Sequence, residues 1–327
     1  MSNKAYCLSM CPQSEVIFRR KNGLVHFWNE NDEESLENAK KPDDSHFMVK
    51  EYTRSAAGKE ILNFQVLRPF SVLEKTVFHL MKIANNLKSN DNWSLAYGFI
   101  TDRLRAVRQD MTVQRLNPME SLQLLESIII FYIKAFYRCE IGIDRCATYD
   151  RKLHRMQLYD CLADWRELFE HLKLENERIL QCYLFVNALE PWSLLQLKRW
   201  KSFLSIDSLK FAEEAIISMR TKNFVRFFRL ISKQNDLILR CSMLFHASFM
   251  RFSALLACSI AYKCRNVKLP FHYLLRVLKM DKDALCQALN EIGFEGNDFY
   301  SFGVEVNSNI GLSSAHWLKT QEIAEYF

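Results

Sequence analysis

The sequence predicts an all-α protein, in which a body of helical repeats is followed by a winged-helix subdomain. Its 327 residues include only 8 Gly and 6 Pro, and four of the glycines lie between residues 293 and 311. Because Gly and Pro interrupt helices, their low number favours long helices over a fold of many short strands. Hydrophobic residues make up 49% of the chain and include 24 Phe, which is typical of a globular protein with a sizeable core.

The first 46 residues predict an irregular N-terminal arm. It contains an acidic cluster made of Glu30, Asp32, Glu33, Glu34 and Glu37, followed by a linker over 40–44. The Cys-Pro pair Cys11-Pro12 and the pair Phe27-Trp28 supply apolar anchors. We therefore expect the arm to lie along the body of the protein in places.

Capping residues mark the first two helices of the body. Ser71 and Glu74 have the spacing of a capping box and predict a helix over 71–88. Asn117, placed directly before a proline, predicts the N-cap of a helix over 118–139.

Between these two helices, the segment 97–116 predicts a helix with two different faces. Its apolar face has alternating spacings of three and four residues, at Tyr97, Ile100, Leu104, Val107 and Met111. Asp102, Arg105 and Gln109 fall on the opposite face, with Arg103 and Asp110 on a flank beside them. Charged pairs on an exposed helix contribute only about 0.2–0.5 kcal/mol each. The spacing alone therefore favours a solvated charged face.

Further helices are expected near 150–171, 175–188, 192–203, 207–219, 222–234 and 236–264. The apolar stretch 241–262 contains Arg251, and an arginine at the centre of a bilayer costs at least about 2.5 kcal/mol. We therefore interpret this stretch as a buried core helix, and we expect no membrane association.

The C-terminal part has the order helix, helix, wing. Residues 269–278 predict a short helix, and Asp281 can cap a second helix that runs to Ile292 and ends at Gly293. The alternating residues 299–306 predict a β-wing. The second helix is acidic and polar apart from one lysine, so we favour a packing role over DNA reading. The predicted domains are the arm over 1–46, a helical domain over 47–265, a winged-helix-like end over 266–310 and a tail over 311–327.

The sequence contains no recognisable catalytic or metal-binding pattern. Its ten cysteines include no Cys-x-x-Cys, so we expect reduced, buried thiols and no metal site. The segment around Gly58-Lys59 lacks the first glycine of a phosphate-binding loop and has Glu60 in place of its hydroxyl residue. We expect no nucleotide or other cofactor and no enzymatic activity.

The most specific segments are Tyr97–Asp110 and Val49–Lys59, which together closely resemble the Sac domain of the GANP (germinal-centre-associated nuclear protein) family. Met10-Cys11-Pro12 resembles the opening of that family, and Leu67-Arg68-Pro69 resembles a turn in it. The resemblance extends from about residue 10 to about residue 300. The family-motif positions, for which we expect structural roles, are Cys11, Pro12, Tyr52, Arg54, Ser55, Gly58, Lys59, Asp102, Arg103, Arg105, Arg108, Gln109 and Asp110.

Particular motif residues carry further expectations. Arg54 is expected to pair with an acidic group or a carbonyl, and Gly58 to allow a turn that a side chain would strain. Two positions depart from the family pattern. Tyr132 stands where the family commonly has His, and His154 stands where Asn is expected.

The resemblance implies a non-enzymatic scaffold with a tetratricopeptide/PCI-like helical body. Longer family members hold together the nuclear complex that couples transcription to messenger-RNA export. The partners implied are a PCI-type helical winged-helix protein and a small acidic subunit of that complex. In length the chain is most similar to short stand-alone members, which are linked to the centrosome and the mitotic spindle. The alternative is therefore a centrosome-duplication and spindle adaptor that binds no nucleic acid. The expected localisation is the nucleus and cytoplasm, with the centrosome or spindle under the alternative.

The net charge of +6 is a mild excess of basic residues, which permits contact with RNA or another acidic partner. We expect any RNA contact to be weak and without sequence preference, through Lys263, Arg265 and Lys268 in the connector before the winged helix. The arginines of the 97–116 helix, with Arg115 at its end, are a second basic region.

Overall fold

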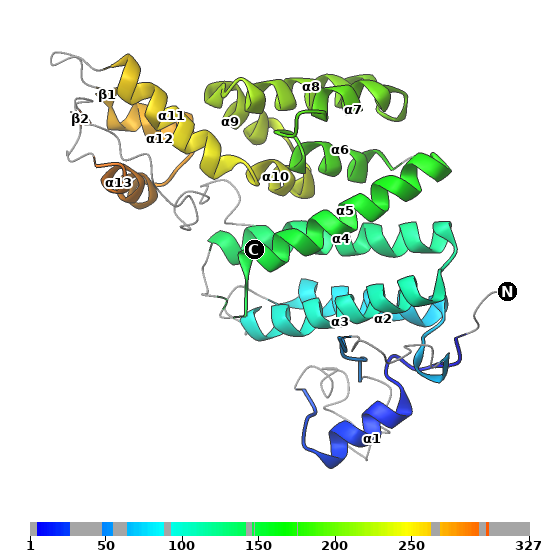
Figure 1. The fold of residues 1–327 in the computed structure, drawn as a ribbon. Coiled ribbons are helices and arrows are strands. Elements are labelled where there is room, and N and C mark those ends of the chain that lie inside the picture. The colour runs from blue at the N-terminus through cyan, green and yellow to red at the C-terminus, as the bar shows by residue number, and fades with distance from the viewer. Residues whose placement is uncertain are drawn as a thin grey trace. The chain divides into compact units, whose positions relative to one another are not determined.

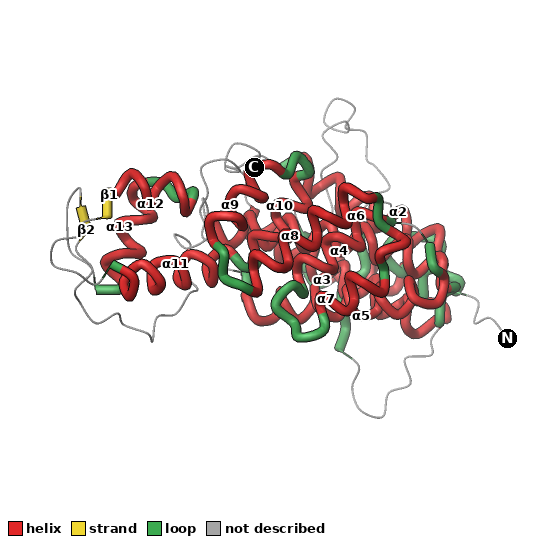
Figure 2. The backbone as a smooth tube through the Cα atoms, turned by 90° about the horizontal axis from the view of Figure 1, so that it is seen from above, coloured by secondary structure: helices red, strands yellow, loops and turns green. Residues whose placement is uncertain are grey.

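The computed structural model describes residues 5–26, 48–54, 64–87, 93–141, 146, 148–174, 176–262, 269–293 and 299–300. The chain divides into two compact units. The first comprises Met1–Tyr132 with Asp144–Lys173, and the second comprises Ile133–Ile143 with Leu174–Phe327. Figure 2 shows that helices make up most of the described chain. The prediction of an all-α fold is confirmed.

The described part of the first unit is built from helices of different lengths (Figure 1). They are α1 (Gln13–Lys21), the 3-10 helix η4 (Phe64–Val66), α2 (Phe70–Asn86), α3 (Trp93–Gln114), the first part of α4 (Pro118–Ile141) and α5 (Arg151–Leu172). Helix α2 packs against α3. The start of α4 is as predicted, because the Asn117 side chain accepts a hydrogen bond of 3.0 Å from the backbone N–H of Met119.

Two expectations for the N-terminal half are wrong. Helix α2 begins at Phe70 and its N-cap is Pro69, with no side-chain cap, so Ser71 lies inside the helix and no capping box forms. The arm, which was expected to be irregular, contains α1. This helix has Glu15 in its first turn and basic residues in its last turn, an arrangement that suits the helix dipole.

The second unit begins with the last part of α4 and is also mostly helical. Its elements are α6 (Glu177–Val186), α7 (Ser193–Arg199), the 3-10 helix η5 (Lys201–Phe203), α8 (Ile206–Arg220), α9 (Phe224–Lys233), α10 (Leu237–Leu244), α11 (Ala247–Ala261), β1 (Leu269–Pro270), α12 (Phe271–Leu278), α13 (Lys282–Glu291) and β2 (Phe299–Tyr300). Helix α8 packs against α6, α7 and α9, and α6 also packs against α10.

The single helix expected over 236–264 is two helices. The axes of α10 and α11 meet at an angle of 54°, and the break lies at Phe245 and His246. His246 Nε2 lies 2.9 Å from the carbonyl oxygen of Phe185, a contact that holds the bend against α6. Within the described ranges, no single helix is both long and apolar enough to cross a membrane, although α10 and α11 taken together would pass on length and composition.

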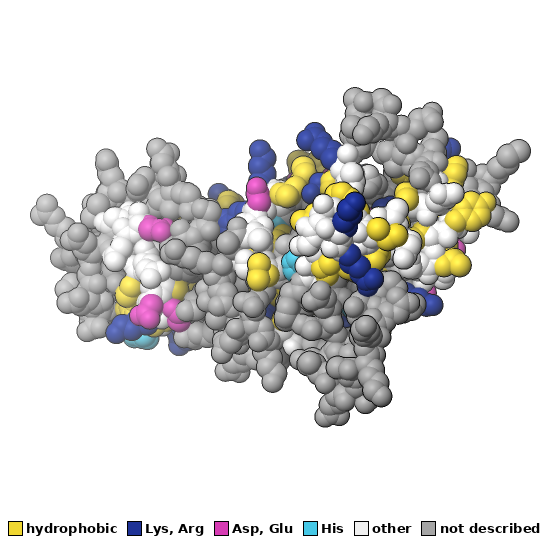
Figure 3. All heavy atoms as spheres, turned by 90° about the horizontal axis from the view of Figure 1, so that it is seen from below, with side chains coloured by type: hydrophobic (Ala, Val, Ile, Leu, Met, Phe, Trp, Pro, Cys, Tyr) yellow, Lys and Arg dark blue, Asp and Glu magenta, His cyan; other side chains and the backbone are white. Residues whose placement is uncertain are grey.

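Helices α12 and α13 follow one another as predicted, but residues 269 and 270, expected to begin the first of these helices, form strand β1. Asp281 accepts a hydrogen bond of 2.7 Å from the N–H of Ala284 and caps α13, and Gly293 follows α13 with a positive φ of +88°. Strands β1 and β2 pair antiparallel, with Leu269 opposite Tyr300. Residues 301–306 of the predicted wing lie outside the described residues. Figure 3 shows acidic side chains on the surface formed by α13, whose exposed residues include Asp283 and Glu291.

The apolar face predicted for α3 is buried as expected. Leu104, Ile100 and Val107 are fully buried, and Tyr97 and Met111 are at most 7% exposed. Because this face packs into the interior along most of α3, the helix organises the core of the first unit.

A charge on this face should therefore unfold the first unit. We predict that Leu104→Asp destabilises the protein by several kcal/mol, about the cost of an unpaired buried charge. Leu95, 54% exposed on the same helix, provides the matched control, since Leu95→Asp should cost less than about 1 kcal/mol. Thermal unfolding followed by circular dichroism measures both. Equal melting temperatures for Leu104→Asp and the wild type would mean that α3 buries a different face.

Candidate functional site

The polar face of α3 centres on a buried carboxylate. Asp110 is 0% exposed. Its Oδ1 lies 2.7 Å from Lys50 Nζ, and its Oδ2 lies 2.7 Å from Arg68 Nε. Arg68 is also 0% exposed and Lys50 is 9% exposed. We refer to these three residues as the Asp110 cluster. It is the opposite of the solvated face that helix spacing favoured.

Two further donor contacts of the Asp110 cluster hold backbone from other segments. Lys50 Nζ donates to the carbonyl of Val66 at 3.0 Å, and an Arg68 Nη atom donates to the carbonyl of Met10 at 3.2 Å. The same Met10 carbonyl accepts from the backbone N–H of Lys50 at 3.0 Å. Gln114, one turn after Asp110, donates to the carbonyl of Arg68 at 2.8 Å. One carboxylate on α3 thereby organises three segments that are distant in sequence.

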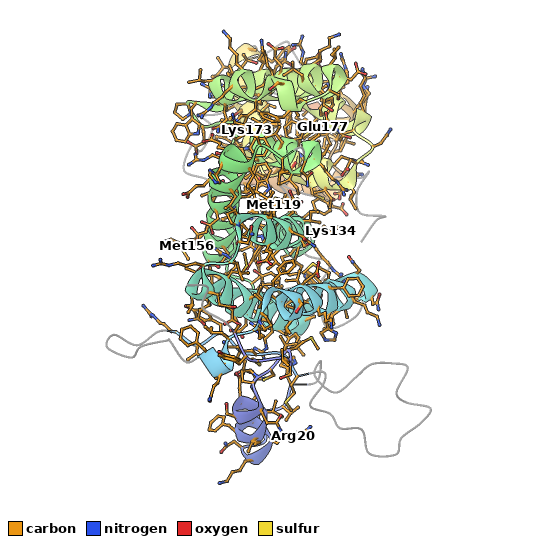
Figure 4. The ribbon with its side chains drawn as sticks, turned by 90° about the vertical axis from the view of Figure 1, so that its right-hand side faces the viewer. Arg20, Met119, Lys134, Met156, Lys173 and Glu177 are labelled. Carbon is orange, nitrogen blue, oxygen red and sulfur yellow. The ribbon has the colours of Figure 1, made fainter. Side chains whose placement is uncertain are left out.

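A second set of charges ties α1 to the same face. Glu51 Oε1 accepts from Arg103 on α3 at 2.7 Å and lies 3.2 Å from Arg19 on α1. Arg19 also pairs with Glu15 and donates to the carbonyl of Val49 at 3.2 Å. Arg19 is buried whereas the adjacent Arg20 is exposed, and Figure 4 shows Arg20 on the outer side of α1. Arg19 therefore attaches α1 to the segment that contains Val49 and Glu51, whereas Arg20 faces solvent.

The other polar residues of α3 hold the extended segment 51–54. Asp102 accepts from the backbone N–H of Tyr52 at 3.2 Å, and Gln109 donates to the carbonyl of Thr53 at 2.9 Å. The Arg105 guanidinium lies 4.0 Å from the centroid of the Tyr52 ring, a cation–π contact. These contacts hold Tyr52 and Thr53, two consecutive residues of the segment, against α3.

Arg108 is the motif residue of α3 that faces a different neighbour. It donates to Gln157 at 3.0 Å and lies 3.3 Å from Asp164, both on α5. Since Arg103, Arg105 and Arg108 all contact the protein itself, Arg115 is the exposed member of the basic region expected on this helix.

The Cys-Pro motif forms a small local core. Cys11 is fully buried with Val16 and Met48, and Pro12 is the N-cap of α1. Burial raises the pKa of the Cys11 thiol to about 12, so the side chain acts as a small neutral hydrophobe. No group of three or more His, Cys, Asp or Glu residues able to hold a metal occurs among the residues that the structure describes.

Other predicted site residues are not drawn into this arrangement. Arg54 is exposed and has no ion-pair or hydrogen-bond partner in the described part of the chain, and its expected pairing stays a prediction. Ser55, Gly58 and Lys59 lie outside the described residues, as do Lys263, Arg265 and Lys268.

Several members of the site were not identified from sequence. Lys50, Glu51 and Arg68 lie within the stretches that carry the family resemblance, and that position was the available signal. For Glu15 and Arg19, the only available signal was that an acidic and a basic residue stand four positions apart.

The two positions that depart from the family pattern contact each other. His154 Nε2 lies 3.0 Å from the backbone oxygen of Tyr132, and the two rings are 5.3 Å apart in a T-shaped arrangement. A carbonyl oxygen only accepts, so Nε2 carries the proton and Nδ1 accepts from the hydroxyl of Tyr97 at 2.9 Å. Burial lowers the pKa of His154 to about 3. The imidazole is therefore a neutral connector inside the first unit.

These features define a class of protein: a mostly helical protein in which the charged face of helix α3 holds the N-terminal segments through ion pairs and hydrogen bonds. The family model described as the SAC3/GANP family matches residues 10–298. The chain belongs to this family.

Three relatives illustrate the similarity. SAC3 family protein B of Arabidopsis thaliana is 28% identical over 270 residues, which cover 76% of this chain and 15% of that protein. Protein xmas of Drosophila melanogaster is 22% identical, with 98% and 16% covered. SAC3 family protein 1 of Schizosaccharomyces pombe is 23% identical, with 96% and 31% covered. The chain thus spans less than a third of the length of each of these relatives.

Removing the charge of Asp110 should release the N-terminal segments. We predict that Asp110→Asn costs about 3–5 kcal/mol, because two buried cations lose their counter-charge. Asp164→Asn is the matched control. The Asp164 side chain is 57% exposed, and its loss should cost less than about 1 kcal/mol.

Urea unfolding measures both free energies, and amide hydrogen exchange at Lys50 and along α1 reports the local release. A cost for Asp110→Asn no larger than that of the control would contradict the role of the Asp110 cluster.

His154 should make stability depend on pH. The folded-state pKa of about 3 lies below the ordinary histidine value of 6.5, so the unfolded chain binds the extra proton. The contribution is complete above about pH 6.5 and is lost as the pH falls toward 3. Between pH 7.5 and 5.5 we predict a loss of about 1.4 kcal/mol in the free energy of unfolding from this residue.

His154→Gln, which does not titrate, should remove that part of the pH dependence. His272→Gln, at an exposed site on α12, should leave it intact. The same pH dependence in His154→Gln and the wild type would mean that His154 is not the titrating group.

Proposed function

We propose that this protein is a non-enzymatic interaction scaffold that takes part in nuclear messenger-RNA export coupled to transcription. The observation that carries the proposal is that the polar face of α3 contacts other segments of the same chain. Asp110, Arg103 and Asp102 hold the chain's own segments. Charges that are paired and hydrogen-bonded within the chain in this way hold its segments together and do not present a reactive group. Membership of the SAC3/GANP family supports the same assignment.

The architecture that we propose is a tetratricopeptide/PCI-like body with a winged-helix end. The successive packing of α6, α8 and α9 supports a body of stacked helices. The order α12, α13 and β2, with β1 paired to β2, supports a winged helix. The exposed acidic residues of α13 favour a packing role for that helix over contact with nucleic acid.

The partners proposed are a PCI-type helical winged-helix protein and the small acidic subunit of the export complex, in the nucleus and cytoplasm. RNA contact, where it occurs, would be weak and without sequence preference. The basic connector residues Lys263, Arg265 and Lys268 are its proposed site. The alternative is an adaptor of the centrosome and spindle, built on the same helical body and without nucleic-acid binding.

Affinity purification of the tagged chain from nuclease-treated cell extract, followed by mass spectrometry, distinguishes these assignments. We expect a PCI-type protein and a small acidic protein to co-purify in stoichiometric amounts, because a scaffold forms stable interfaces. The Leu104→Asp variant identifies chaperones and other binders of unfolded chains. Recovery of centriolar and spindle proteins instead would contradict the export role and favour the alternative, and recovery of neither set would contradict both.

A further inference from the structure

A groove lies between α9 and α12, two helices of the second unit that pack against each other. Its volume is about 410 Å³, at the small end of the range of about 300–1,000 Å³ typical of ligand pockets. This size suits one or two side chains of a bound peptide. The helices contribute residues three and four positions apart, so each presents one continuous face to the groove.

The charge of the groove has one sign. Arg229 on α9, Arg276 on α12 and Lys279 at the end of α12 line it, and none of its lining residues is acidic. Arg229 and Arg276 are exposed, and neither forms an ion pair within the described ranges of the chain. Arg226 and Lys233, both exposed on α9, extend the basic surface along the same helix. The groove therefore attracts a negatively charged occupant.

The apolar part of the groove consists of Val225, Phe228, Tyr273 and Val277. Phe228 is 1% exposed and Tyr273 is half-buried, with the Arg276 guanidinium 5.8 Å from the centroid of its ring. Binding of single-stranded nucleic acid relies on open aromatic faces on which bases stack. Two valines and a buried phenylalanine instead suit an aliphatic or aromatic side chain.

A buried arginine holds both walls of the groove in place. Arg251 on α11 is 0% exposed. It donates to the carbonyls of Leu278 at 3.1 Å and Lys279 at 3.0 Å, and its guanidinium lies 5.1 Å from the centroid of the Phe228 ring. The same side chain thus contacts the end of α12 and the α9 wall. A preformed groove loses little conformational entropy when it binds a ligand.

Lys279, which also lines the groove, has an unusual backbone conformation. Lys279 has a positive φ of +53° at the C-cap of α12, where glycine is the usual residue. A lysine in the left-handed region is uncommon, and at this position its residue lines the groove.

We propose that this groove binds a short acidic peptide segment of a partner protein, in which carboxylates flank one aromatic or aliphatic anchor. The anchor occupies the space between Val225 and Val277, and the carboxylates pair with Arg229 and Arg276. This inference rests on the groove itself and goes beyond the proposed export role.

Fluorescence anisotropy with the full chain tests the proposal. The probe is a short fluorescein-labelled peptide in which Asp and Glu residues flank a central Phe. We expect Arg229→Glu combined with Arg276→Glu to weaken binding at least about tenfold, because two charge pairs are reversed. Val225→Ser, which leaves every charge in place, should weaken it about threefold through the lost apolar contact.

Matched controls separate a specific groove from general attraction. Lys198→Glu combined with Lys201→Glu changes the net charge by the same amount at exposed positions of α7 and η5, and should alter affinity less than about twofold. A probe with Ser in place of Phe should bind more weakly than the original. Circular dichroism melting should be unchanged for the exposed-site variants.

Equal losses from the two double reversals, or equal binding of the Phe and Ser probes, would overturn the proposal in favour of non-specific charge attraction. Displacement of the probe by oligouridylate, with tighter binding of that RNA than of the peptide, would overturn it in favour of nucleic acid. The assay uses purified chain and no export subunit. Its failure therefore leaves the proposed export role standing, and the partner purification can fail while this binding succeeds.

Discussion

The ion pairs of Asp110 are the interaction on which the first unit depends. A carboxylate with no exposed surface is tolerated only when it is paired and hydrogen-bonded, and Lys50 and Arg68 each approach one of its oxygens at 2.7 Å. Those two cations also hold the carbonyls of Val66 and Met10. The position of the N-terminal segments on α3 thus follows from the need to neutralise a single buried charge.

Single buried polar side chains also connect helices elsewhere, through hydrogen bonds to backbone carbonyls. His154 connects α5 to the Tyr132 carbonyl as a neutral imidazole, and Arg251 connects α11 to the carbonyls that end α12. Arg251 satisfies carbonyl groups at the end of α12, which lack intrahelical partners. Burial lowers the pKa of Arg251 to about 9, so it remains charged at neutral pH. The protein uses its buried polar groups to hold helices together, which suits a scaffold.

Some basic side chains of this protein contact other parts of the chain, whereas others are exposed and available to a partner. The arginines of α3 that drew attention in the sequence, Arg103, Arg105 and Arg108, contact the protein itself. Arg229 and Arg276 in the second unit are instead exposed beside an apolar groove. A count of basic residues does not distinguish these situations, because the difference lies in which acidic side chains or aromatic rings the fold brings near each cation.

The sequence by itself determined the features that arise between neighbouring residues. The apolar spacing of α3, the Asn117 and Asp281 caps and the glycine after α13 could all be predicted, because each depends on residues within one or two helical turns. The family motifs also included the residues of α3 that hold the N-terminal segments, among them Asp102, Arg103 and Asp110. Tertiary structure alone decided that Asp110 is buried and which cations neutralise it, since Lys50 and Arg68 lie 60 and 42 residues away. It also decided the break at His246, because the carbonyl that holds the bend belongs to Phe185, 61 residues away. Helical periodicity reports which residues share a face, whereas long-range packing determines what that face contacts.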